Sequence, residues 1–178
     1  MAKVYFEQGP IRPPSEAYSL LLRVTRNCPW NRCEFRHTYK GEKFSLRTVE
    51  EVKRDIDIVQ EIVSEVKALS WQNGFGGEIT APLVNLILQN PKHYSDGFRS
   101  VALWLYTGGK NVFLQDGNNL ILKTHDLLEM LKYLKETFPS MLRKKINKKI
   151  NYLTFKILMV YDGHHFVRSL NFYYGKDF

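Results

Sequence analysis

Cysteine is scarce in this chain: Cys28 and Cys33 are the only two among 178 residues. Long apolar runs are missing too, since no stretch of about 18 consecutive apolar residues occurs that could span a membrane. The opening residues, MAKVYFEQGPIRPP, contain neither the apolar segment nor the small-residue cleavage site of a secretory signal. We therefore expect a cytoplasmic protein with no membrane partner. A structural disulfide is disfavoured there, which leaves metal binding, redox chemistry or ordinary burial for the two thiols.

Acidic residues are nearly absent from the last part of the chain. Residues 141–178 hold eight Lys and Arg residues against two Asp and no Glu, and they contribute most of the net charge of +8. A basic tail raises nucleic acid as a partner, because Lys side chains bind phosphates. Without a recognisable RNA- or DNA-binding motif, however, the charge fits a solvated tail better. The lysines that would contact phosphates are Lys144, Lys145, Lys148 and Lys149.

Two short apolar runs predict buried strands. The run YSLLLRVT spans residues 18–25, and the core of the second run occupies residues 112–114. Their Leu, Val and Phe content is typical of strands that are covered on both faces. Each run passes directly into a polar loop, which spans residues 26–44 after the first strand and residues 115–119 after the second.

Helices are predicted between and after these strands. Thr48 and Glu51 form a capping-box pattern, and apolar residues then recur every three or four positions. A second helix begins near Thr80, a third ends at two consecutive glycines, and a fourth occupies residues 124–138. In the third helix one face carries Phe98, Val101, Ala102 and Leu105. In the fourth, the side chains expected to face the core are Leu127, Leu128, Leu131 and Leu134.

This order of elements predicts an α/β protein with parallel strands, because a parallel pair needs a long crossover connection. Ligands of such folds usually bind at the carboxyl ends of the strands, and both polar loops fall at that end. The tail shows no clean period. A Lys-rich helix at 142–151 or a short apolar strand at 152–160 could form there, and neither has a convincing partner.

Two segments carry a resemblance to a known family. The first, GPIRPPSEAYSLLLRVTRNCPWNRCEFRHTYKGEKFSLRTVEEVKRDI, surrounds both cysteines, and the second, SDGFRSVALWLYTGGKNVFLQDGNNLIL, follows later. They resemble the N-terminal part of a radical S-adenosylmethionine (SAM) subfamily, one described as similar to oxygen-independent coproporphyrinogen III oxidase. Its cluster loop reads cysteine, four residues, cysteine, two residues, cysteine. The resemblance implies an incomplete partial (β/α) barrel, with the first two β/α units and extra helices in residues 1–140.

The family's chemistry depends on a four-iron four-sulfur (4Fe-4S) cluster. Three thiolates hold three of its irons, the fourth iron binds SAM, and reduction of the cluster cleaves SAM to a 5′-deoxyadenosyl radical. By resemblance, Cys28 and Cys33 match the first two metal ligands, and Phe35 matches the aromatic residue that lies along the adenine of SAM. The loop after the second strand matches the region that meets the methionyl end of SAM. This makes Gln115, Asp116 and Asn118 the candidate cofactor-binding residues.

The role of Asp116 and the identity of the third cluster ligand both leave alternatives open. Asp116 would accept a hydrogen bond from the ammonium group of SAM, or it merely caps its own turn. Arg36 stands where the third cysteine belongs, and a guanidinium offers iron no lone pair, so we expect catalysis to be impaired. His37 is an alternative ligand, since histidine binds iron in some clusters, or it is an ordinary loop residue. A scaffold that retains only the fold is a further alternative.

Beyond about residue 140 the family pattern stops. Residues 141–178 are rich in Lys, Asn, Ile, Tyr and Phe, a composition typical of an out-of-frame reading of A/T-rich DNA. We therefore expect a truncated family member with a separate, unrelated tail. An open half-barrel would expose strand edges and apolar surface, which favours self-association. No particular substrate follows from the resemblance.

Overall fold

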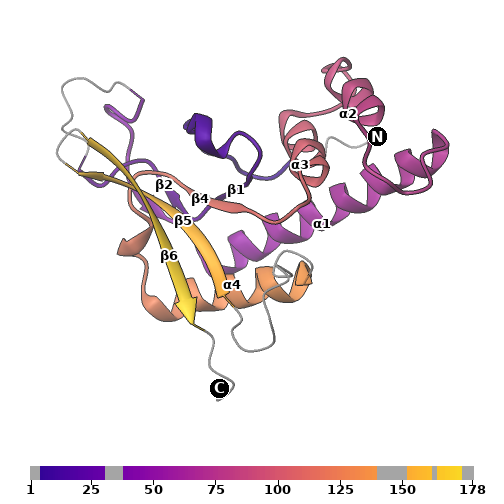
Figure 1. Cartoon of the computed structure of the whole chain (residues 1–178). Coiled ribbons are helices and arrows are strands. Elements are labelled where there is room, and N and C mark those ends of the chain that lie inside the picture. Colours follow the sequence, from indigo (N-terminus) through magenta and orange to yellow (C-terminus); the bar gives the residue numbers. More distant parts are fainter. Residues whose placement is uncertain (1–4, 31–37, 140–151, 162–163, 174–178) are drawn as a thin grey trace.

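A computed structural model describes residues 5–30 and 38–139 and the backbone of two strands, 152–161 and 164–173. The described residues form a mixed α/β fold around a four-stranded sheet in the order β1-β4-β5-β6. Figure 1 shows α1 and α4 side by side along this sheet, with α2 and α3 clustered near the far end of α1. The α/β class expected from the sequence is therefore confirmed.

The helices lie close to their predicted positions. They span Val49–Gln72 (α1), Ala81–Leu88 (α2), Asp96–Tyr106 (α3) and Thr124–Thr137 (α4). Helix α1 begins with the predicted capping box, because the Thr48 hydroxyl accepts from the Glu51 amide at 3.2 Å and the Glu51 carboxylate accepts from the Thr48 amide at 2.8 Å. The middle of its apolar stripe is buried, with Val52, Ile56, Val59, Ile62 and Val66 in the core, while Val49 and Leu69 at its ends are partly buried.

One predicted core position is wrong. Leu128 is 39% exposed, because the buried face of α4 is narrower than predicted and consists of Leu127, Met130, Leu131 and Leu134. Leu105 is partly buried and packs against the core, and Trp104, which is 2% exposed, lies beside it in the core. The other predicted residues of the two helices are buried.

Strands β1 (Leu20–Arg23) and β4 (Val112–Gln115) are adjacent and parallel, with Leu20 opposite Val112 and Arg23 opposite Gln115. Helices α1, α2 and α3 form the crossover between them. A short antiparallel pair, β2 (Thr25–Arg26) and β3 (Ser45–Leu46), and two single-turn helices, η1 (Pro14–Glu16) and η2 (Asn119–Ile121), complete these units. The parallel pairing places both strand ends, and the loops that follow them, at the same edge of the sheet.

The tail departs from expectation. Strand β5 (Tyr152–Tyr161) confirms the strand considered at 152–160, but the expectation that it lacks a partner is wrong. It pairs in parallel with β4, and β6 (His164–Tyr173) pairs antiparallel with it. The overlooked signal is the Asp162-Gly163 dipeptide between two β-prone runs, a strong hairpin signature. The predicted helix at 142–151 lies outside the described residues.

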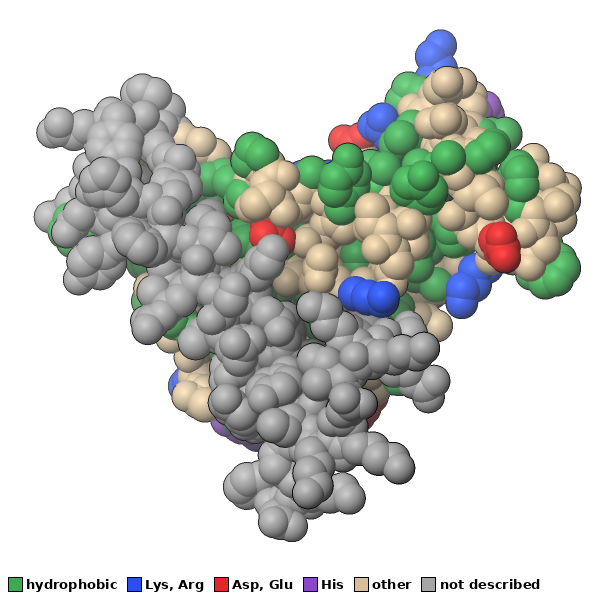
Figure 2. Space-filling view, in the orientation of Figure 1, with side chains coloured by type: hydrophobic (Ala, Val, Ile, Leu, Met, Phe, Trp, Pro, Cys, Tyr) green, Lys and Arg blue, Asp and Glu red, His purple; other side chains and the backbone are tan. Residues whose placement is uncertain are grey.

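Figure 2 shows apolar side chains gathered over the lobe formed by α2 and α3, with Lys and Arg side chains scattered between them. Leu86 and Tyr106 are 38% and 48% exposed there. Exposed apolar residues of this kind are ordinary on a protein surface and indicate no site by themselves. Among the described helices, none has both the length and the apolar composition needed to cross a membrane.

Candidate site at the carboxyl ends of β1 and β4

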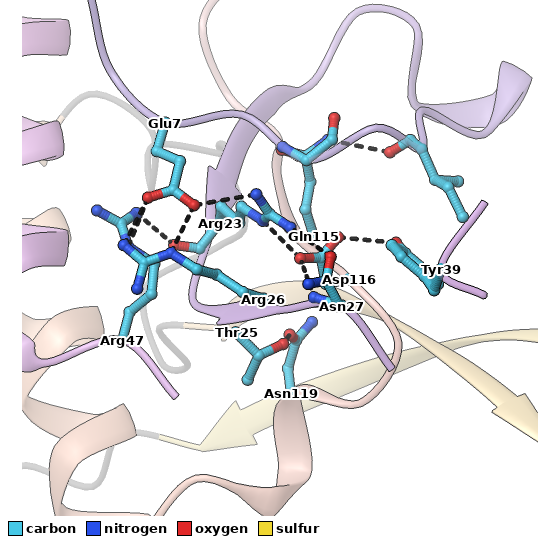
Figure 3. Close-up of polar contacts among 12 residues, drawn as sticks. Glu7, Arg23, Thr25, Arg26, Asn27, Tyr39, Arg47, Gln115, Asp116 and Asn119 are labelled. Carbon is cyan, nitrogen blue, oxygen red and sulfur yellow. Dashed lines mark hydrogen bonds and ion pairs between the residues drawn. The ribbon is translucent and has the colours of Figure 1, made fainter. Parts of the chain in front are cut away.

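The two polar loops predicted to share one edge of the sheet meet there (Figure 3). Asp116 is the point of contact. Its Oδ2 accepts from Arg23 Nε at 2.5 Å and from the Asn27 amide at 3.0 Å, and its Oδ1 accepts from the Tyr39 hydroxyl at 2.7 Å. The nearest of these three donors in sequence is 77 positions away. In the described residues Asp116 therefore joins distant segments, which neither of its two predicted roles foresaw.

The backbone of Asp116 adopts a φ of 85°, in the left-handed region that favours glycine. The residue is also only 1% exposed. Both the strained backbone and the burial of a charge cost free energy, which favourable contacts must offset. The charge of Arg23 and two further donors provide these contacts. Burial, followed by the neighbouring Asp116 carboxylate, raises the pKa of Tyr39 well above its ordinary value, so Tyr39 stays a neutral donor.

Gln115 faces the N-terminal segment of the chain. Its Oε1 accepts from the Gly9 amide at 2.8 Å, and its Nε2 donates to the carbonyl oxygens of Gly9 and Ile11 at 3.2 and 3.0 Å. The side chain is completely buried. Gln115 thus binds the chain's own backbone, and both N–H groups of its amide are used there.

The last two residues of the loop after β4 organise the turn. The Asn118 side chain accepts from the Leu120 amide at 3.1 Å and caps η2. Asn119, which the sequence interpretation overlooked, is completely buried; it donates to the Leu114 carbonyl at 2.7 Å and accepts from the Thr25 hydroxyl at 3.1 Å. Both asparagines stabilise the loop.

Cys28 packs directly on this loop. A β-carbon on Gly117 would lie 3.1 Å from the Cys28 α-carbon and 3.2 Å from its Sγ, so any larger residue would press on Cys28. Cys33, Phe35, Arg36 and His37 lie outside the described residues. Among the residues that are described, no three His, Cys, Asp or Glu side chains come together as a metal site.

An arginine cluster beside Asp116 was not predicted. Arg23, Arg26 and Arg47 surround the Glu7 carboxylate, and each has a second acidic partner. These partners are Asp116 for Arg23, Glu51 for Arg26 and Asp55 for Arg47. The available sequence signal was two arginines, Arg23 and Arg26, at the end of an otherwise apolar strand. A charge at such a position needs a partner when it is buried.

The hydrogen bond from Arg26 lowers the pKa of Glu7 below its ordinary value, and the charges of Arg47, Arg26 and Arg23 add to the effect against partial burial. Glu7 is therefore ionised at neutral pH. Comparison of the chain with protein-family models, curated proteins and solved structures finds no match.

Proposed function

We propose that the chain is a non-catalytic relative of the radical SAM enzymes. In this proposal β1, β4 and their helices correspond to the first two β/α units of the family's partial barrel. One observation carries the argument: Cys28 of the loop after β1 packs on Gly117 of the loop after β4. The resemblance assigns these two loops to the cluster and to SAM, and their contact at the carboxyl ends of adjacent parallel strands supports that assignment.

The residues available as iron ligands do not fit the family's 4Fe-4S cluster. Cys28 and Cys33 supply two thiolates, whereas Arg36 supplies a cation that cannot ligate iron. The SAM side is compromised as well, because Gln115 binds the Gly9 and Ile11 backbone and Asp116 already accepts three hydrogen bonds. We therefore derive no step of SAM cleavage for this chain.

What the site does achieve is structural. Arg23, Tyr39 and Asn27 hold the Asp116 carboxylate, and Asp116 ties the loops after β1 and β4 together. Gln115 fixes the N-terminal segment across the same edge. A polar network that is satisfied internally stabilises one arrangement of the loops, which is the property of a retained scaffold.

The test is anaerobic reconstitution with iron and sulfide, carried out in parallel on the wild-type chain, Arg36→Cys and Arg36→Ser. The serine variant removes the cation without adding a thiolate. We expect only Arg36→Cys to take up about four irons and to show the visible absorption of a cluster. A full cluster in the wild-type chain would overturn the loss of catalysis and would point to His37 as the third ligand. Failure of Arg36→Cys to bind iron would overturn the family assignment.

A further inference from the structure

The N-terminal segment lies across the ends of β1 and β4 through alternate residues. Glu7 contacts the arginine cluster, Gly9 is bound by Gln115, and Ile11 packs against the small apolar cluster of Leu21 and Phe113. A β-carbon on Gly9 would lie 2.6 Å from Asp116 Oδ1. The N-terminal segment therefore binds to the ends of β1 and β4 in the way that a separate peptide would.

Four N–H groups from three arginines converge on the single carboxylate of Glu7. Arg26 forms a two-pronged pair, with Nε 2.8 Å from Oε1 and Nη2 2.7 Å from Oε2. Arg23 Nη1 lies 3.0 Å from Oε1, and Arg47 Nε lies 3.5 Å from Oε2. Planar guanidinium forks arranged in this way suit carboxylate and phosphate oxygens.

Glu7 leaves this cluster incompletely satisfied. The Arg47 side chain is only 4% exposed, and its buried Nε has no hydrogen-bond partner. A buried donor without a partner is rare and calls for an explanation. Glu7 Oε2 lies 3.5 Å from this nitrogen without forming a hydrogen bond to it, while the same carboxylate accepts from Arg26 and Arg23, so Glu7 fills the cluster imperfectly.

Each of the three arginines also has an acidic partner other than Glu7. Asp116 accepts from Arg23 Nε, Glu51 from Arg26 Nη2 and Asp55 from Arg47 Nη1, at 2.5, 2.7 and 2.5 Å. These contacts hold the guanidinium groups in place, so the cluster is preorganised. Glu7 itself is reachable, because its side chain is 22% exposed.

We propose that Arg23, Arg26 and Arg47 form an oxyanion socket that Glu7 of the chain's own N-terminal segment fills, and that a phosphate group can take the place of Glu7. The oxygens of a phosphate are arranged tetrahedrally, so one of them can turn toward Arg47 Nε while the others accept from the donors that Glu7 uses. The socket lies beside the proposed radical SAM loops but requires neither a cluster nor SAM, so it stands or fails independently of the family assignment.

Displacement of Glu7 would loosen a short stretch of chain. Phe6 is 1% exposed and packs on Gly97, and Arg12 donates to the Ser100 hydroxyl at 2.5 Å, so both ends of the segment are pinned. Between these pins the segment is held by the Glu7 carboxylate and by the contacts of Gln115 with Gly9 and Ile11, so loss of the Glu7 contact leaves fewer bonds to hold it down. Phosphate binding is thus coupled to a local opening over Gln115 and Asp116.

The test measures thermal unfolding of Glu7→Ala in inorganic phosphate, acetate and chloride at equal ionic strength. We expect phosphate at several times its Kd to raise the Tm by about 2–4 °C. Acetate should raise it less, because it has two oxygens. The matched control is Glu61→Gln, at an exposed position of α1, which should show a smaller phosphate-specific shift because its Glu7 still competes for the socket. The double variant Glu7→Ala, Arg26→Ala should lose the response.

A folded Glu7→Ala variant without a phosphate-specific shift would overturn the proposal, and so would an equal shift in Glu61→Gln or in the double variant. Glu7→Gln, which keeps the side-chain volume, replaces Glu7→Ala if the latter does not fold. Hydrogen exchange of the wild-type chain provides an independent measurement. There, phosphate should speed exchange of the Gly9 amide about twofold or more while the α1 amides stay unchanged. An unchanged Gly9 amide would contradict the coupling.

Discussion

The Tyr39 hydroxyl donates a 2.7 Å hydrogen bond to Asp116 Oδ1 and so joins the loop after β1 to the end of β4. Both groups are buried, and Asp116 is held in a left-handed backbone conformation. This single contact therefore links a strained residue to a segment 77 positions away. It makes Tyr39 a sensitive position for testing the described site.

Tyr39→Phe removes this donor while it keeps the ring. We expect the free energy of unfolding to fall by about 1–3 kcal/mol, because a buried carboxylate oxygen loses its partner. Urea denaturation measures the change. Tyr18→Phe is the control, since Tyr18 is 58% exposed, and it should change stability by less than about 0.5 kcal/mol. Equal effects of the two substitutions would contradict the role of Tyr39.

The close approach of Gly117 to Cys28 makes a second prediction. Gly117→Ala places a β-carbon 3.1 Å from the Cys28 α-carbon, so the loop that carries Cys28 must shift. We expect a loss of about 1–3 kcal/mol in unfolding free energy, as for other overpacked sites. We also expect faster alkylation of the Cys28 thiol, measured in a Cys33→Ala background so that a single thiol reports. An alkylation rate equal to that of the parent would show that the loops do not pack on each other.

Thr48→Ala serves as the matched control for that measurement and is a prediction of its own. It removes the side-chain acceptor of the capping box at the start of α1, which typically costs about 1 kcal/mol. The variant does not touch the loop of Cys28, so its thiol should react as in the parent. Thermal unfolding measures the stability loss, and a Tm equal to that of the wild type would contradict the contribution of the cap.

The contrast between these sites reflects what a sequence can predict. The capping box and the apolar stripe of α1 are local patterns, so they were predictable from residues three or four positions apart. The meeting of the two polar loops was also predictable, because parallel strands align their carboxyl ends. Leu128 was misplaced because periodicity alone does not set the width of a buried stripe.

The long-range polar contacts could not be predicted from local sequence patterns. Arg47 and Glu7 are charged residues of types that are usually exposed, and only folding brings them together. Gln115 was selected as a ligand-binding residue, yet its partners are backbone atoms of Gly9 and Ile11, which no side-chain pattern encodes. The pairing of β5 with β4 was missed for a related reason: the tail lacks a clean period, and parallel pairing depends on chain topology.

The ionisation of Glu7 predicts how stability depends on pH. Its pKa is lowered from the ordinary 4.5 by the Arg26 hydrogen bond and by three arginine charges, so the folded state favours the carboxylate. A group of this kind stabilises the fold fully above its unfolded pKa, and the contribution disappears as the pH falls through the lower pKa of the folded state. Stability of the wild-type chain should therefore decline below about pH 4.5 in part because Glu7 becomes protonated.

Glu7→Gln isolates this contribution, because it keeps the side-chain shape and removes the charge. At pH 7 we expect the variant to be less stable than the wild type by about 1–2 kcal/mol, at the low end for charged hydrogen bonds because Glu7 is partly exposed. Below the folded pKa of Glu7 the two unfolding free energies should converge, since the wild-type side chain is then neutral too. Urea denaturation from pH 7 to pH 3 measures both curves, with Glu61→Gln as the control that should run parallel to the wild type. A difference between wild type and Glu7→Gln that stays constant down to pH 3 would contradict the pairing of the Glu7 carboxylate with the arginine cluster.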